Sequence, residues 1–319
     1  MHRNLTRKLL RALTSPFTRM PGESFAGQLP ALSGLQSQTA ELLSAHVHYL
    51  AGTIGERHIG RYDALCASVD YIAGAFEAAG YKPQRHGFEL LGKTVCNVDA
   101  TLPGKSGRVL VIGAHYDSIP GSAGADDNAS GTAAVLALAK LLKDFVPNDT
   151  IRFVAFANEE HPCLPATTMG SYEYARMCHQ NGDQVRMMVL EMLGFFKHED
   201  NTQHYPFPFN LVYPTTGNFL GFVGNWKSRQ LLHQCIGSFR RHGNFPSDGV
   251  AAPDFVRDIG RSDHWGFWQF GYPAIMITDT ANFRNPHYHT ELDTPDTVDY
   301  QSMSRVVTGL AEMVKEIAG

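Results

Sequence analysis

The 319-residue sequence has few cysteines, and none of them forms a Cys-x-x-Cys motif. They are odd in number and irregularly spaced, at Cys66, Cys96, Cys163, Cys178 and Cys235. This pattern indicates neither a disulfide framework nor a zinc finger. It favours free or buried thiols in a reducing compartment.

The sequence also lacks a long apolar run and a strong charge of one sign. No stretch approaches the roughly 18 apolar residues of a membrane span. The formal net charge is only −4, so no strong basic patch is implied and nucleic acid is not an expected partner. The first 20 residues contain arginine and lysine but no acid, and they lack the apolar run of a secretory signal. A cytoplasmic location is therefore expected, with secretion as the alternative.

Hydrophobic residues, in contrast, make up 43% of the chain, which is enough for a large core. Residues 1–34 are interpreted as a basic N-terminal arm followed by a linker that contains Gly, Pro and Ser. The candidate functional residues are spread over the remainder of the chain. Residues 35–319 are therefore predicted to form a single catalytic domain.

Apolar patterns predict that strands alternate with helices along this domain. Apolar residues at helical spacing predict helices over 37–50, 62–79, 133–145, 171–178, 228–241 and 303–317. A strand-like zone covers 82–102, and short apolar runs predict buried strands at 109–112, 151–156, 185–190 and 274–278. This alternation predicts an α/β fold, a three-layer α/β/α sandwich around a mostly parallel mixed sheet.

Three of the predicted strands are followed by side chains that can bind a metal ion. His115 and Asp117 follow the first strand, Glu159-Glu160 the second, and Glu191 the third. In open α/β sheets, ligands lie beyond the carboxyl ends of the strands, so these groups are expected at one rim. A carboxylate at the end of a buried strand costs several kcal/mol unless it is paired or metal-bound. The pattern therefore predicts a metal site.

Two loops add further candidates. Asp126 and Asp127 precede a predicted helix, where acids also serve as ordinary helix caps. His287 and His289 lie in a proline-containing loop, and their spacing alone does not decide between them. The Asp263-His264 pair has two interpretations, as support for a metal ligand or as a capped turn.

Mixed imidazole and carboxylate groups are ligands that suit Zn²⁺ and similar divalent ions. A carboxylate that bridges two such ions about 3.5–4 Å apart lets them share a hydroxide, which can attack a polarised carbonyl. An unligated glutamate beside the ions can accept the water proton and pass it to the leaving amine. The Glu159-Glu160 pair could supply one ligand and one base.

In this order, the motifs resemble those of the zinc-dependent exopeptidase family that includes bacterial leucyl aminopeptidases, glutamate carboxypeptidases and glutaminyl cyclases. The resemblance spans about residues 40–315. It is carried by His115-x-Asp117, Asp127 within Asp-Asn-Ala-Ser-Gly, Glu159-Glu160, Glu191 and Tyr288-His289. Each motif is weak alone, but five in the same order are specific.

The resemblance implies a site for two zinc ions per chain. His115, Asp127 and Glu191 would hold one ion. Asp127, Glu160 and His289 would hold the other, so that Asp127 bridges the two. The choice of His289 over His287 comes from the resemblance and not from the spacing.

The resemblance also implies roles for groups outside the metal cage. Glu159 corresponds to the general base, and Asp117 to the residue that orients the His115 ring. The Asp127–Asn128 bond lies where the family commonly has a cis peptide. Two features depart from the family: Glu191 stands where many relatives have aspartate, and residues 161–166 separate Glu160 from Gly170-Ser171 by more than in many relatives.

The function expected from this site is that of a metallo-aminopeptidase that hydrolyses the N-terminal peptide bond of peptides. One alternative is a glutaminyl cyclase-like aminoacyltransferase with a single zinc, and another is a hydrolase of a different small amide. A third is a binding domain that has lost its metals, which is disfavoured because every ligand position is filled. A peptide or small amide is the expected substrate.

Overall fold

The protein is described by a computed structural model that covers residues 15–319 except 164–165, 206–209, 211–212 and 257. Arg3, Arg7, Lys8 and Arg11 of the predicted basic arm therefore lie outside the described residues. The described strands form one sheet in the order β1-β2-β4-β3-β5-β8-β6-β7. Their bounds are β1 Gln84–Leu90, β2 Lys93–Leu102, β3 Arg108–His115, β4 Thr150–Phe156, β5 Gln184–Glu191, β6 Leu220–Asn225, β7 Ser247–Ala252 and β8 Ala274–Thr278.

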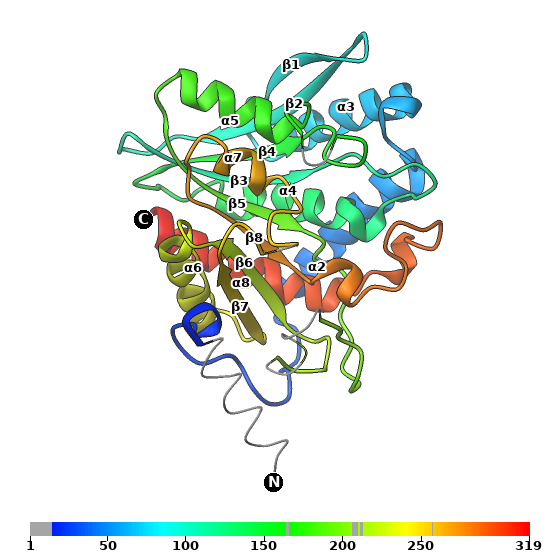
Figure 1. Ribbon diagram of the computed structural model, residues 1–319. Coiled ribbons are helices and arrows are strands. Elements are labelled where there is room, and N and C mark those ends of the chain that lie inside the picture. The colour runs from blue at the N-terminus through cyan, green and yellow to red at the C-terminus, as the bar shows by residue number, and fades with distance from the viewer. Residues whose placement is uncertain (1–14, 164–165, 206–209, 211–212, 257) are drawn as a thin grey trace.

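Helices cover both faces of this sheet (Figure 1). The main helices are α2 Gly34–Val47, α3 Tyr62–Ala78, α4 Gly131–Leu142, α5 Gly170–Gln180, α6 Arg229–His242, α7 His264–Trp268 and α8 Tyr300–Ala318. Helices α3, α4 and α6 pack on one face, and α2 and α8 pack against this layer. Helices α5 and α7 pack on the other face. The arrangement confirms the predicted three-layer α/β/α sandwich.

The central strands are apolar throughout because both of their faces are buried. In β3, Leu110 and Ile112 belong to the core under α3 and α4, whereas Val109 and Val111 belong to the core under α5 and α7. Strand β3 pairs in parallel with β4 and with β5. A continuous apolar run is what such a strand requires, and this is why the sequence pattern located it correctly.

Several elements differ from the prediction. The strand-like zone over 82–102 is a hairpin of β1 and β2, whose turn places Leu91 and Gly92 at positive φ. Strands β6 and β7 and helix α7 were not predicted. Glycines interrupt the apolar pattern of both strands, at Gly221 and Gly224 in β6 and at Gly249 in β7. Helix α7 has only five residues, too few for a helical period to be visible.

The predicted linker contacts the edge of the sheet. The Ser247 N–H at the start of β7 donates to Ser24 Oγ at 2.8 Å. Arg240 of α6 donates to the carbonyl oxygens of Pro21 and Gly22 at 3.1 and 3.0 Å. The division at residue 34 stays a prediction, but this part of the segment is attached to α6 and β7. Within the described ranges, no helix is long and apolar enough to cross a membrane.

Candidate metal centre

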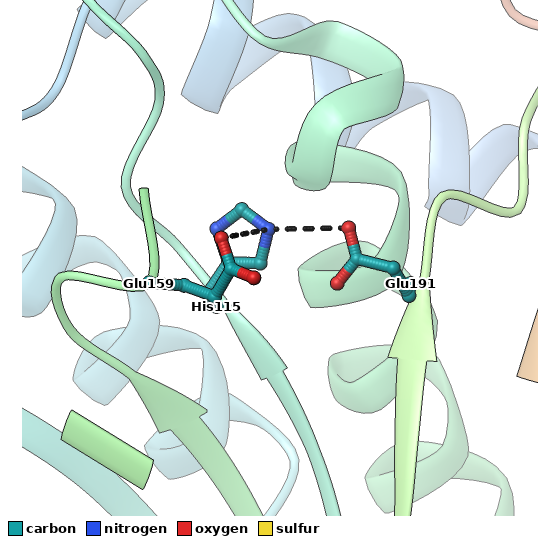
Figure 2. Close-up of side chains that lie close together, drawn as sticks. All are labelled: His115, Glu159 and Glu191. Carbon is teal, nitrogen blue, oxygen red and sulfur yellow. Dashed lines mark hydrogen bonds and ion pairs between the residues drawn. The ribbon is translucent and has the colours of Figure 1, made fainter. Parts of the chain in front are cut away.

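Neighbouring parallel strands bring the first group of candidate ligands together. His115 is the last residue of β3 and Glu191 the last of β5. The strands pair with Gly113 opposite Val189, so both side chains leave the sheet at the same level and on the α5/α7 face. Figure 2 shows the imidazole between two carboxylates. His115 Nε2 lies 3.4 Å from Glu191 Oε1 and 3.9 Å from Glu159 Oε2.

Three loops build a second group next to the first. His289 Nε2 lies 3.1 Å from Asp127 Oδ2 and 3.3 Å from Glu160 Oε2. The other oxygen of Asp127, Oδ1, lies 3.4 Å from His115 Nε2. One carboxylate therefore faces both groups, one oxygen toward each. His287 is not in this cluster and packs against the ring of Phe195 instead.

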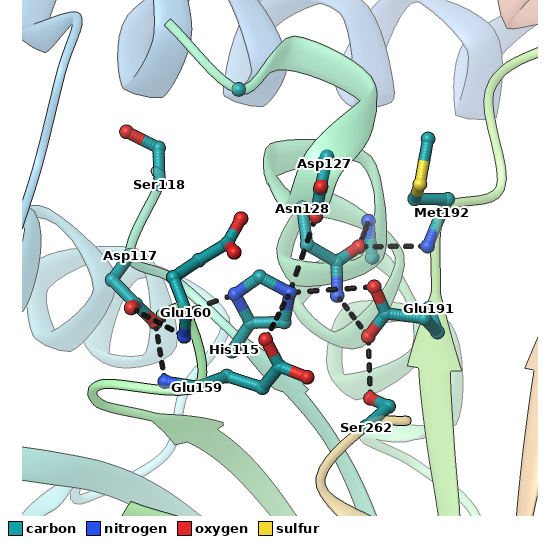
Figure 3. Close-up of polar contacts among 12 residues, drawn as sticks. His115, Asp117, Ser118, Asp127, Asn128, Glu159, Glu160, Glu191, Met192 and Ser262 are labelled. Carbon is teal, nitrogen blue, oxygen red and sulfur yellow. Dashed lines mark hydrogen bonds and ion pairs between the residues drawn. The ribbon is translucent and has the colours of Figure 1, made fainter. Parts of the chain in front are cut away.

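Asp117 holds both glutamates in place and lies beside the first histidine (Figure 3). Its two carboxylate oxygens accept the backbone N–H groups of Glu159 and Glu160, each at 3.1 Å. Asp117 Oδ1 also lies 3.3 Å from His115 Nδ1. The predicted contact with His115 is present, while the contacts with the Glu159-Glu160 backbone were not predicted.

Glu191, at the position where the family resemblance implies aspartate in many relatives, is held by two donors. Ser262 Oγ donates to Glu191 Oε2 at 2.6 Å, and Asn128 Nδ2 donates to the same oxygen at 3.3 Å. The other oxygen, Oε1, is left to face His115. These two donors fix one rotamer of the Glu191 side chain, which is one methylene longer than that of aspartate.

The loop that carries Asp127 is fixed at both ends. Asp293 accepts the backbone N–H groups of Asp126 and Asp127 at 2.8 and 3.0 Å. Asn128 Oδ1 accepts those of Gly131 and Met192, each at 3.0 Å. The Asp127–Asn128 peptide is cis, as the family resemblance implied.

A buried arginine, Arg57, supports the segment that leads into the same loop. Arg57 is fully buried and donates to the carbonyl oxygens of Tyr116 at 2.6 Å, Gly124 at 2.7 Å, and Ala123. Burial lowers its pKa to about 10 against the opposing effect of nearby carboxylates, of which Asp117 is the strongest. Sequence reasoning missed Arg57, because a lone arginine in an aperiodic segment carries no signal of burial.

Asp263 and His264 do not join the two groups of candidate ligands. His264 is buried, its Nε2 lies 2.6 Å from the carbonyl oxygen of Ile259, and its ring packs edge-on against Trp268. Burial lowers its pKa to about 4. It is therefore a neutral core histidine at the start of α7.

The charges of this centre do not balance among the protein's own groups. Four buried carboxylates, Asp127, Glu159, Glu160 and Glu191, surround two imidazoles. Burial and the charge of Asp127 raise the pKa of Glu160 to about 7. Burial acts to lower the pKa of His289, but the nearby Asp127 and Glu160 carboxylates outweigh this effect and raise the pKa to about 9. Such shifts mark a surplus of negative charge in a region of low dielectric.

Divalent cations would neutralise this surplus, and the donors present fit them. The side chains form two groups of three, His115-Glu159-Glu191 and Asp127-Glu160-His289, with ligand atoms within 4.8 Å of one another in each. Glu160 Oε1 is buried without a hydrogen-bond partner in the described part of the chain. Imidazole with carboxylate oxygen is a donor set that suits Zn²⁺.

The role of Ser262 can be tested by removing its hydroxyl. Ser262→Ala leaves Glu191 Oε2 with the weaker donor Asn128 alone, so the carboxylate becomes free to rotate. Loss of such supporting contacts typically weakens metal binding by about 10–100-fold. We expect the zinc dissociation constant to rise by that factor in a competition titration with a chromogenic chelator.

A matched control is Ser68→Ala, which removes another fully buried serine hydroxyl, bonded to Ala64 O within α3. Its zinc affinity should equal that of the wild type. Unchanged zinc affinity in Ser262→Ala would contradict the role given to this contact.

Comparison with known proteins assigns a family. Residues 97–314, which contain every candidate ligand, match the family described as Peptidase family M28. YfbL, an uncharacterized protein of Escherichia coli, is 34% identical over 284 residues, which cover 86% of this chain and 87% of YfbL. A probable leucine aminopeptidase of Trichophyton verrucosum is 29% identical over 221 residues, 65% of this chain. The match spans about half of that relative, 53% of its length.

Solved structures show the same fold. BSAP, a zinc aminopeptidase from Bacillus subtilis, is similar with a TM-score of 0.70 and 15% identity, over 87% of this chain and 95% of BSAP. A glutaminyl cyclase of Bacteroides thetaiotaomicron is similar with a TM-score of 0.67 and 18% identity, over 90% of this chain and 99% of that one. At such identities the similarity establishes the fold and does not separate the two activities.

The family match extends over more than half of the chain, and the sequence similarity to YfbL extends over most of it. Both agree with the zinc exopeptidase resemblance seen in the motifs, and the predicted class of enzyme, a metal-dependent peptidase, is confirmed. The chain belongs to peptidase family M28.

Proposed function

We propose that the protein is a zinc aminopeptidase that hydrolyses the N-terminal peptide bond of peptides at a two-metal site. The observation that carries this proposal is the position of Asp127. Its Oδ1 lies 3.4 Å from His115 Nε2 and its Oδ2 lies 3.1 Å from His289 Nε2. A carboxylate shared in this way is the arrangement that a pair of ions about 3.5–4 Å apart requires.

The family resemblance assigns the ligand sets, and the two contacts of Asp127 support them. His115, Asp127 and Glu191 would hold one ion, and Asp127, Glu160 and His289 the other. When bound, zinc would supply a water of lowered pKa and polarise the scissile carbonyl. The protein's part is to fix these ligands, which Asp117, Ser262 and Asn128 do through the hydrogen bonds described above.

Glu159 is the proposed general base. It reaches the first group from the loop after β4, and Glu159 Oε2 is 3.9 Å from His115 Nε2. Asp127 and Glu191 each approach the same nitrogen to 3.4 Å, so Glu159 is the outermost of the three carboxylates. In this position its carboxylate can accept the proton of the attacking water and deliver it to the leaving amine.

The relatives support peptide hydrolysis but leave a second activity to be tested. A probable leucine aminopeptidase is among the sequence relatives, and a zinc aminopeptidase among the structures. A glutaminyl cyclase shares the fold to a similar degree. The single-zinc, cyclase-like alternative is disfavoured because Asp127 lies between the two histidines, with one oxygen toward each.

The products distinguish the two activities. Zinc-loaded protein incubated with the peptides Leu-Gly-Gly and Gln-Gly-Gly should release free leucine and glutamine, as measured by mass spectrometry. Treatment with a chelator should abolish this release, and added zinc should restore it. Formation of pyroglutamyl peptide from Gln-Gly-Gly, without release of leucine from the other peptide, would overturn the proposal.

The base assignment is tested by Glu159→Gln, which keeps the size of the side chain but cannot accept a proton. We expect kcat to fall by about 10²–10⁴-fold, the usual contribution of a positioned acid–base group. Zinc content measured by plasma mass spectrometry should remain at the wild-type value, because Glu159 is not a proposed ligand.

The control for this variant is Glu173→Gln on α5, where the glutamate bonds the exposed Arg176. Its activity should equal that of the wild type. Loss of zinc from Glu159→Gln would show that Glu159 is a ligand, and full activity would show that it is not the base.

A further inference from the structure

An open pocket begins at the candidate metal centre and runs across the sheet. It is open to solvent, with Glu191 and Tyr288 at the end nearest the metal ligands. Its floor follows one row of paired residues. Glu191 of β5 pairs with Thr278 of β8, Thr278 with Gly221 of β6, and Gly221 with Asp248 of β7.

The pocket exists because helices leave this part of the sheet uncovered. Helices α5 and α7 pack on the same face, but their core reaches only as far as Met276 of β8 and the partly buried Val223 of β6. Gly221 adds no side chain to the floor between Thr278 and Asp248. Apolar and aromatic side chains, among them Val250 and Phe283, line the remaining walls.

Asp248 places a carboxylate at the far end of this apolar pocket. Its side chain is 30% exposed, and none of the described residues donates a hydrogen bond to it. The nearest cation is Arg240, whose NH2 is 4.0 Å from Asp248 Oδ1. Arg240 already donates to Ser247 Oγ, Ser247 O and two carbonyl oxygens of the N-terminal segment. Burial raises the pKa of Asp248 to about 6, because the charge of Arg240 offsets only part of the cost of burial.

The other charges of the pocket are already paired. Asp258 lies 3.5 Å from Arg261 NH1. Arg261 NH2 lies 3.4 Å from the Tyr288 hydroxyl at the near end. Tyr205, which also lines the pocket, has a buried hydroxyl without a hydrogen-bond partner in the described ranges. The pocket therefore offers a carboxylate that accepts no hydrogen bond from the described residues, and a hydroxyl without a partner there.

The length of the pocket suits a long side chain. Three strand spacings of about 4.8 Å separate Glu191 from Asp248, so their backbones are about 14 Å apart. A leucine side chain held at the metal centre would leave much of this distance empty. The four-carbon stem of lysine and the longer chain of arginine would lie on the apolar walls and direct the cation toward Asp248.

We infer that this pocket binds the side chain of the residue to be released, and that Asp248 selects peptides with an N-terminal lysine or arginine. The inference rests on the proposed aminopeptidase function and names its substrate class. The Asp248 carboxylate would accept a charge-assisted hydrogen bond from the substrate cation, with the Tyr205 hydroxyl beside it. Asp248 is thus a specificity residue and takes no part in the bond cleavage.

The test compares kcat/KM for the 4-nitroanilides of lysine, arginine, ornithine, glutamate, methionine and leucine. The wild type should prefer lysine and arginine over methionine, which has a similar length but no charge. In Asp248→Asn, the ratio of lysine to methionine should fall at least about tenfold while the methionine value stays within about twofold. Asp248→Glu, whose carboxylate reaches further into the pocket, should shift the preference from lysine toward the shorter ornithine.

The matched control is Asp258→Asn, which changes another pocket aspartate that Arg261 already pairs. It should keep the lysine-to-methionine ratio of the wild type. A wild type that cleaves leucine and methionine best, with a ratio that Asp248→Asn does not change, would overturn the inference and leave the aminopeptidase function standing. A preference for glutamate would assign recognition to Arg261 instead, and failure to cleave any of these substrates would overturn both proposals.

Discussion

Four carboxylates buried around two imidazoles are the feature on which the rest of this structure depends. Buried carboxylates repel one another and lose their hydration, a cost that the two histidines alone do not offset. The low-dielectric surroundings that make this cluster costly also make it a strong site for divalent cations. The fold therefore has to hold the cluster together before any cation arrives.

The fold does this by giving the ligands partners from distant parts of the chain. Asp117 holds the backbone of Glu159 and Glu160, Asp293 holds the backbone of Asp127, and Ser262 holds the side chain of Glu191. These partners lie between 42 and 166 residues along the chain from the groups that they hold, and the sheet and its loops bring them into contact.

 The separations in sequence are 42 residues for Asp117 and Glu159, 71 for Ser262 and Glu191, and 166 for Asp293 and Asp127. The site is consequently a property of the whole domain and not of any one motif.

The sequence predicts the parts of this arrangement that local chemistry determines. Apolar runs ended by His115, Glu160 and Glu191 identify both the buried strands and the rim at which they deliver their side chains. Asp127 and His289 lie in loops, where the spacing of residues in the sequence does not determine which side chains meet. Only the family resemblance selected them.

Arg57, Asp293 and Ser262 act through contacts with residues far along the chain, so no local pattern reveals them. Strands β6 and β7, and with them the pocket floor at Gly221 and Asp248, were hidden because glycines break their apolar period.

The central claim is that Asp127 bridges two metal ions, and anomalous X-ray diffraction from crystals of the zinc-loaded protein tests it most directly. Data collected on both sides of the zinc absorption edge should show two peaks about 3.5–4 Å apart, one near each oxygen of Asp127. The first peak should lie beside His115 and Glu191, and the second beside Glu160 and His289. A single peak at full zinc loading, or two peaks without Asp127 between them, would contradict the account.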